Sequence, residues 1–197
     1  RYNNSDGIRM EGSSSPTLTG NIITGNQKAG FQSPNSNPTY SGNAIHSNGI
    51  NGIEVGGGTM NSSVTWQCQD APFVLGSITV ASGVMLTVEP GVTIKFNNNV
   101  ELYVNGTMNA DGTPEQPVYF TSLKDDTVGG DTNGDGNATS PAPGDWRFIQ
   151  FASSSSGVLD NVGIRYGGCE SGHYPYQLLV DTSSLTISNC MIEYSRV

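Results

Sequence analysis

One segment of the sequence has residue types and spacing that suit a metal ion. From position 131 it reads Asp-Thr-Asn-Gly-Asp-Gly, so the oxygen-bearing residues Asp131, Asn133 and Asp135 alternate, and Gly136 permits a sharp turn. Calcium prefers about six to eight oxygen ligands, and this alternation gathers carboxylate and amide oxygens around one point. We therefore predict that the segment is a calcium-binding loop.

Further oxygens are needed to complete the calcium shell. The backbone carbonyl of Asn137 and the hydroxyl of Thr139, the latter through water, stand at the next positions of the pattern. Ala142 occupies the place where an EF-hand has its bidentate glutamate, so the loop is not a complete EF-hand. We expect a nearby carboxylate to fill this gap, from Asp125, Asp126 or Asp145. An acidic, glycine-rich turn without an ion is the alternative.

The composition of the whole chain restricts its fold and its partners. The 197 residues include 8 Lys+Arg against 17 Asp+Glu, a net charge of -9, which excludes the basic surface that nucleic-acid binding needs. No apolar stretch is long enough to span a membrane. The 26 glycines, with many Asn, Ser and Thr residues, disfavour helices and favour short strands joined by turns. Net acidity and scarce lysine point to an extracellular or cell-surface protein.

An internal repeat runs through the chain with a period of about 22 to 28 residues. Residues 16–23 match residues 38–45 at an offset of 22, and residues 159–164 match residues 187–192 at an offset of 28. A glycine followed by an apolar residue also recurs at Gly7, Gly30 and Gly52, and we align these three positions with one another. Because the period is nearly constant, each unit is expected to be translated from the last along one axis.

Each repeat contains three short stretches in which apolar and polar residues alternate, as in half-buried strands. One such set is Ile78–Val80, Leu86–Val88 and Ile94–Phe96. Three short strands per unit predict an all-β solenoid, a parallel β-helix of about six to seven coils. We expect coils over residues 1–62 and 74–197, a junction or cap-like segment at 63–73, and the calcium loop as an insertion at 124–144.

The repeats at residues 16–23 and 159–168 resemble those of right-handed, pectin-lyase-like β-helix proteins. Residues 76–151 are similar to a segment common in secreted and surface proteins of bacteria and archaea, with motifs such as Val88-Glu89-Pro90-Gly91 and Gly144-Asp145-Trp146. The resemblance implies a right-handed parallel β-helix over most of the chain. It specifies function weakly, because this fold hosts lyases, glycosidases, adhesins and structural rods.

Both ends of the sequence read as further coils, without the polar capping units that close a solenoid. If a second copy followed the first, 28 positions would separate Ile187 from Leu18, which equals the offset between Leu159 and Ile187. We therefore predict a structural extracellular subunit that stacks end to end with copies of itself, or one period of a tandem array, in a surface rod or filament. The alternatives are a polysaccharide-binding or polysaccharide-degrading protein and an adhesin.

The sequence assigns no catalytic residue, and an enzymatic activity is not predicted. A lyase would need a basic residue near bound calcium, for which Arg147 and Arg165 are candidates, although pairing with surface acids explains them as well. The acids available for glycoside hydrolysis have no distinctive spacing and are Asp160, Asp181 and Glu193. The tyrosines that can stack on sugars or on one another are Tyr166, Tyr174, Tyr176 and Tyr194.

Three cysteines and four glycosylation sequons are the residues whose chemistry allows covalent modification. Cys169 and Cys190 can pair, which leaves Cys68 over, whereas small buried thiols account for all three without a disulfide. The sequons begin at Asn3, Asn61, Asn105 and Asn137.

Overall fold

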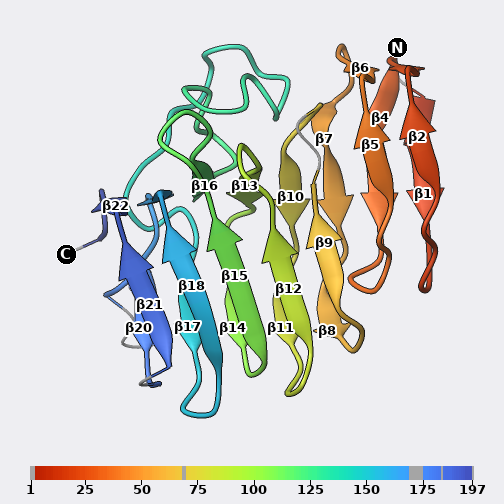
Figure 1. The fold of residues 1–197 in the computed structure, drawn as a ribbon. Coiled ribbons are helices and arrows are strands. Elements are labelled where there is room, and N and C mark those ends of the chain that lie inside the picture. The colour runs from red at the N-terminus through yellow and green to blue at the C-terminus, as the bar shows by residue number, and fades with distance from the viewer. Residues whose placement is uncertain (1–2, 68–69, 169–174, 183, 197) are drawn as a thin grey trace.

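The structure is a computed structural model that describes residues 3–67, 70–168, 175–182 and 184–196. These residues form 22 strands, which follow one another along the axis of the molecule from the N-terminus to the C-terminus (Figure 1). The strand pairs are parallel, and each strand pairs with the equivalent strand one coil away. The described part contains no helix that could cross a membrane.

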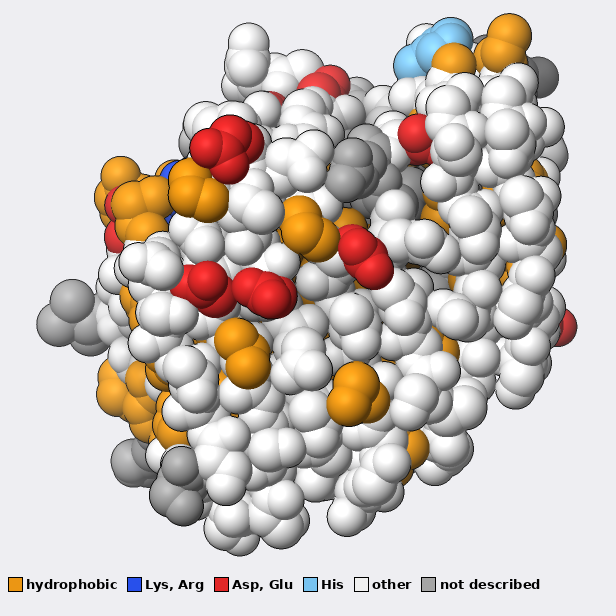
Figure 2. All heavy atoms as spheres, in the orientation of Figure 1, with side chains coloured by type: hydrophobic (Ala, Val, Ile, Leu, Met, Phe, Trp, Pro, Cys, Tyr) orange, Lys and Arg blue, Asp and Glu red, His pale blue; other side chains and the backbone are white. Residues whose placement is uncertain are grey.

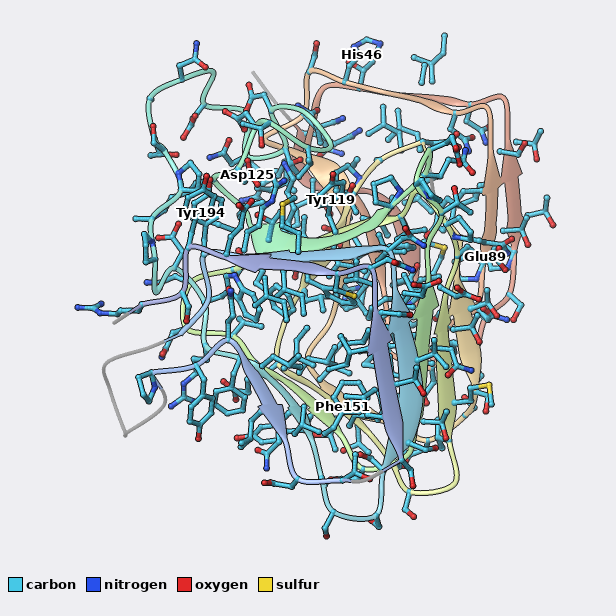
Figure 3. All side chains as sticks on the ribbon, turned by 60° about the vertical axis from the view of Figure 1, so that its left-hand side comes forward. His46, Glu89, Tyr119, Asp125, Phe151 and Tyr194 are labelled. Atoms are coloured by element: carbon cyan, nitrogen blue, oxygen red, sulfur yellow. The ribbon has the colours of Figure 1, made fainter. Side chains whose placement is uncertain are left out.

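Three long parallel sheets enclose the core of the molecule (Figure 3). The long sheet has eight strands: β1 (Asn3–Met10), β4 (Asn26–Gln32), β7 (Ile50–Val55), β10 (Phe73–Leu75), β13 (Thr93–Phe96), β16 (Val118–Ser122), β19 (Val162–Arg165) and β22 (Met191–Glu193). The second sheet has five: β8 (Gly58–Met60), β11 (Ile78–Val80), β14 (Leu102–Val104), β17 (Ile149–Phe151) and β20 (Leu178–Val180). The third sheet also has five: β9 (Val64–Trp66), β12 (Met85–Val88), β15 (Thr107–Asp111), β18 (Ser156–Asp160) and β21 (Leu185–Ser188).

Each strand of the long sheet begins a new coil, so the described chain contains seven three-sided coils and the first strand of an eighth. The prediction of a parallel β-helix with three short strands per coil is confirmed. Two predicted offsets are confirmed as strand registers, since Leu18 pairs with Tyr40 and Leu159 pairs with Ile187. The alternating pattern therefore located the strands because one face of each is buried.

The alignment of Gly7, Gly30 and Gly52 is wrong by one residue at each step. The long sheet instead pairs Ile8 with Gly30 and Gly30 with Ile53. A Cβ atom on Gly30 would lie 2.9 Å from Cδ1 of Ile53, so the isoleucine side chain fills the space above the glycine. The register follows this side-chain packing rather than the matching of glycines.

The core is an apolar column that runs the length of the long sheet. Its inward positions pair in the order Ile8, Gly30, Ile53, Phe73, Ile94, Phe120, Ile164 and Ile192. The members from Ile53 to Ile164 are almost fully buried. Packing side chains of one kind above each other lets a narrow core form from a chain of which only 35% is hydrophobic.

The first two coils differ from the later ones on two sides. They carry two small sheets, in which β2 (Thr17–Thr19) pairs with β5 (Thr39–Ser41), and β3 (Ile22–Ile23) pairs with β6 (Ala44–Ile45). The second and third sheets begin only at β8 and β9, and side chains of the second coil satisfy their edges. Asn35 Oδ1 accepts from the backbone N–H of Asn61 at 2.6 Å, and Asn37 Oδ1 accepts from that of Thr65 at 2.9 Å.

Residues 63–73, expected to form a junction, include β9 and the start of β10. The long sheet passes through this segment without interruption, because β10 pairs with both β7 and β13. Trp66 and Phe73 lie in the core with ring centroids 5.4 Å apart. The change of coil shape thus lies just before this segment, on the other two sides of the solenoid.

Candidate metal centre

The sixth coil carries a long loop, residues 123–148, between β16 and β17. The loop lies over the ends of β16 and β13 and reaches back toward β7 (Figure 1). It covers outward-facing side chains of the long sheet, so Val74, Lys95 and Thr121 are 1%, 0% and 0% exposed. This part of the long sheet is therefore buried on both faces.

Hydrogen bonds attach the loop to three coils. Thr121 donates to Asp125 Oδ2 at 2.6 Å within the sixth coil, and the ammonium of Lys95 in the fifth coil donates to the carbonyl of Asp125 at 2.8 Å. The backbone N–H of Asn51 in the third coil donates to the carbonyl of Thr132 at 2.7 Å. Figure 3 shows Asp125 above the outer face of the long sheet, whereas Phe151 lies inside the solenoid.

Three carboxylates converge within the loop. Asp126, Asp131 and Asp135 each offer one oxygen, and these oxygens lie within 4.8 Å of one another. Burial, followed by the nearby charge of Asp131, raises the pKa of Asp126. Like charges held this close repel unless a cation lies among them.

Several oxygens of the cluster are buried and unpartnered. Asp126 Oδ1, Asn133 Oδ1 and Asp135 Oδ1 have no hydrogen-bond partner among the described residues. Buried polar atoms are nearly always satisfied, so three such oxygens in one loop need an explanation. A calcium ion coordinates carboxylate and amide oxygens directly, so these three oxygens are of the kind that calcium binds.

Hydrogen bonds within the loop orient these oxygens. The backbone N–H groups of Asp135 and Gly136 donate to the Asp131 carboxylate at 3.1 and 3.0 Å. Asn133 Nδ2 donates to Asp135 Oδ2 at 2.8 Å, and the hydroxyl of Thr139 donates to the same oxygen. The side-chain oxygen of Asn133 and the second carboxylate oxygen of Asp135 are left available. The structure thus brings together Asp126, Asp131, Asn133 and Asp135 of the predicted ligands.

The remaining predicted ligands have other surroundings. Both oxygens of Asp145 are engaged, because Lys124 Nζ donates to one at 2.7 Å, and Ser122 Oγ donates to the other at 2.7 Å. The carboxylate of Asp145 is not among the three that converge in the loop. Asn137 is exposed at the surface of the loop, and the Thr139 hydroxyl is directed at Asp135 rather than into the gap between the carboxylates.

The residues considered for catalysis take part in contacts between coils. Arg147 pairs with Glu101 at 2.9 Å, and Arg165 pairs with Glu193 at 2.9 Å. Tyr166 and Tyr194 stack at 4.9 Å, as expected for packing of equivalent side chains in successive coils. Asp181 accepts from Gln150 at 3.0 Å, and Asp160 accepts from Ser188 at 2.7 Å. Cys68, Cys169 and Tyr174 lie outside the described residues, and Cys190 is a free thiol.

Nothing in the sequence singles out Lys95 as a residue that contacts this loop. It alternates correctly as an outward-facing residue of β13, where an exposed lysine is ordinary, and only the loop from the next coil buries it. Burial lowers its pKa to about 8, although the carboxylates of Asp126, Asp125 and Asp131 oppose that shift. The signal is three-dimensional, since the covering residues lie about 30 positions further along the chain.

An open hollow of about 460 Å³ adjoins the loop. Its lining comes from coils two to five and from the loop. It combines the polar residues His46, Asn51, Asp70, Thr93 and Asp131 with the apolar residues Ile45, Ala71 and Pro72 and with glycines. A second hollow of about 370 Å³ shares Gly91, Thr93 and Gly129 with the first and extends it toward Glu115 and Tyr119. The two form a groove along the outer edge of the long sheet.

Comparison with known families supports the fold. A family model described as a right handed beta helix region matches residues 1–70, and one described as a pectate-lyase like beta helix domain matches residues 58–146. The two matches overlap in the third coil, where the small sheets give way to the second and third sheets. No curated protein and no solved structure matches the chain.

Proposed function

We propose a structural role for this chain, which belongs to the right-handed parallel β-helix repeat proteins. The proposed role is that of an extracellular rod segment whose end coils stack on copies of the same protein. The observation that carries this proposal is the coil-on-coil pairing along the described chain, where parallel strands and one apolar column from Ile8 to Ile192 join each coil to the next.

The C-terminal end presents the richer apolar surface. Met191 and Ile192 on β22 are 47% and 48% exposed, and Ile187 on β21 is similarly open. Figure 2 shows apolar side chains gathered along this edge of the molecule, over β20 to β22. At the opposite end, Ile22 on β3 is 73% exposed. A parallel strand edge with apolar side chains is a template for a further coil, which a second copy of the protein can supply as well as the same chain.

The two ends are complementary in register and in charge. Ile8 and Ile192 are the first and last members of the inward column of the long sheet. In the adjacent outward row, Arg9 stands on β1 and Glu193 stands on β22. A second copy whose β1 pairs with β22 therefore continues the column and brings Arg9 next to Glu193. Backbone pairing and apolar burial would both stabilise the contact.

In this proposal, calcium fixes the loop of residues 123–148 on the long sheet. The ion would be held by Asp126, Asp131, Asn133 and Asp135, and it would neutralise the repulsion among their carboxylates. Because the loop contacts the third, fifth and sixth coils, its ordering would stiffen the middle of the rod.

The stacking proposal is tested by sedimentation and electron microscopy over a range of protein concentrations. We expect rods that lengthen with concentration, and Ile192→Lys should abolish them because it places a charge in the apolar column. Met85→Lys is the matched control, since Met85 is 42% exposed on the side of the solenoid, on β12. Particles of a single size at every concentration would refute the stacking role.

The groove beside the loop favours polysaccharide binding as a second candidate function. It offers amide, hydroxyl, imidazole and carboxylate groups along several coils, a pattern suited to sugar hydroxyls. Arg165 lies near its far end, 4.9 Å from the ring centre of Tyr119 and 4.0 Å from Asp125 Oδ2. Binding of acidic and neutral polysaccharides, measured by calorimetry with and without calcium, decides this candidate. Attachment to other cell surfaces, as an adhesin, would follow from such binding.

A further inference from the structure

The ammonium of Lys95 joins the two stretches of the loop that carry the calcium carboxylates. Its Nζ donates to the carbonyl of Asp125 at 2.8 Å and to the carbonyl of Gly130 at 2.7 Å. Asp125 directly precedes Asp126, and Gly130 directly precedes Asp131. One side chain from the neighbouring coil therefore fixes the backbone immediately before two of the three carboxylates.

The surroundings of Lys95 show that this arrangement is built rather than incidental. Lys95 is 0% exposed, and its register partners Val74 and Thr121 are buried with it under the loop. Burying an ammonium is costly unless hydrogen bonds replace its water shell. An uncharged side chain of similar length would pack here at lower cost. The role of the ammonium therefore lies in its two hydrogen bonds to the loop rather than in packing.

We propose that Lys95 is a positioning residue of the calcium centre, one that holds Asp126 and Asp131 facing Asp135 before the ion arrives. The inference rests on the calcium role proposed above. Ordering the loop in advance strengthens ion binding, because the binding free energy is then not reduced by the entropy lost in ordering the loop. Simple electrostatics makes the opposite prediction, since a positive charge near the centre repels calcium.

The test compares Lys95→Met with Lys124→Met in the intact chain. Lys124 belongs to the same loop and carries the same charge, but its ammonium pairs with Asp145 at 2.7 Å instead of joining the two ligand stretches. Calorimetric titration with calcium should give at least tenfold weaker binding for Lys95→Met. Binding by Lys124→Met should be unchanged or tighter. Circular dichroism on both variants establishes that the coils are intact.

Hydrogen exchange of residues 123–136 in chelator supplies a readout independent of calcium. We expect faster exchange of these amides in Lys95→Met and unchanged exchange in Lys124→Met. If Lys95 only stabilises the fold, its loss lowers the melting temperature but leaves the calcium affinity of the folded protein unchanged, which overturns the proposal. Equal or tighter calcium binding by Lys95→Met overturns it as well.

The same measurements also distinguish two further outcomes. If the unsubstituted chain binds no calcium, the proposed calcium role fails, and slower or equal loop exchange in Lys95→Met then also removes the positioning role. If Lys95→Met does not fold, Lys95→Gln replaces it, because its amide keeps a donor without the charge. Recovery of most of the calcium affinity by Lys95→Gln supports positioning through hydrogen bonds, and a tenfold gain over the unsubstituted chain refutes it.

Discussion

In the first two coils, neighbouring turns are joined by ladders of asparagine side chains, whereas the middle coils are joined by aromatic packing and by the loop of residues 123–148. In the first region, Asn43 Oδ1 accepts from both the backbone and the side chain of Asn21, at 3.0 and 2.9 Å. In the second region, Trp146 stacks on Phe96 with ring centroids 4.1 Å apart.

The difference shows two ways to stabilise a solenoid whose coils touch only their neighbours. An asparagine ladder joins one coil to the next and involves no contact with coils further along the solenoid. The loop reaches from the sixth coil to the third, so it couples coils that do not touch each other directly. We therefore expect the middle coils to unfold together and to respond to calcium, and the first two coils to respond to neither the ion nor the loop.

The largest expected effect comes from Trp146→Ala. Trp146 lies near the C-terminal end of the loop and is fully buried, and its Nε1 donates to the carbonyl of Arg165 at 2.7 Å. Removing a large buried aromatic side chain costs about 3–5 kcal/mol, and here it also frees one end of the loop. Urea unfolding measures the loss. A loss below about 1 kcal/mol would mean that the aromatic packing does not hold the middle coils together.

Calcium removal is expected to have the next largest effect. With calcium at about 100 times its dissociation constant, binding to the folded state alone stabilises it by about 2.7 kcal/mol. Chelation should remove this amount from the middle coils, as measured by thermal melting and by hydrogen exchange of each coil. Asp131→Asn should reduce the response, and Asp111→Asn, at an exposed carboxylate on β15, is the control. An equal response of the first two coils would contradict the comparison.

A smaller effect is expected for Asn43→Ala. The side chain of Asn43 is almost buried, and its Nδ2 donates to the carbonyl of Leu18 at 2.8 Å and to Asp70 Oδ2 at 2.7 Å. Its removal leaves buried donors and acceptors unsatisfied, which costs about 2 kcal/mol. The loss, measured by urea unfolding, should be the same with and without calcium. A calcium-dependent loss would show that the two regions are coupled.

The sequence predicted the coils well because their signal is local. Alternation within β11 to β16 marks one buried face, and this pattern is readable without knowing what lies opposite. The proposed calcium ligands Asp131, Asn133 and Asp135 were also recognisable, since their spacing within one turn defines the proposed site. Asp126 was one of three alternatives, because nothing in the sequence shows that Asp145 is engaged by Lys124.

Contacts between distant coils were beyond the reach of the sequence. The outward position of Lys95 looks like that of any surface lysine until the loop from the sixth coil is placed over it. The register of Gly30 likewise depends on the Ile53 side chain of the next coil rather than on the glycine itself. Both cases concern a residue whose surroundings are supplied by another coil.

The smallest expected effect concerns Asp160, which joins the sixth and seventh coils at the surface. Its Oδ1 accepts from Ser188 Oγ at 2.7 Å and from Asn189 Nδ2 at 2.8 Å, and these bonds lower the pKa of Asp160 below its ordinary 3.8. A lowered folded-state pKa means that the carboxylate stabilises the fold above pH 3.8 and that this contribution disappears as the pH falls through the folded pKa. Asp160→Asn should therefore lower the melting temperature slightly at neutral pH and have no effect in strong acid.

Asp111→Asn is the control for this prediction, because Asp111 is the register partner of Asp160 one coil earlier and makes no such hydrogen bonds in the described structure. It should change the melting temperature less than Asp160→Asn at neutral pH. A difference that persists in strong acid would mean that the substitution acts through the shape of the turn rather than through the charge. The polar links of the sixth and seventh coils would then resemble the asparagine ladders of the first two coils, which depend on hydrogen bonds between neutral groups.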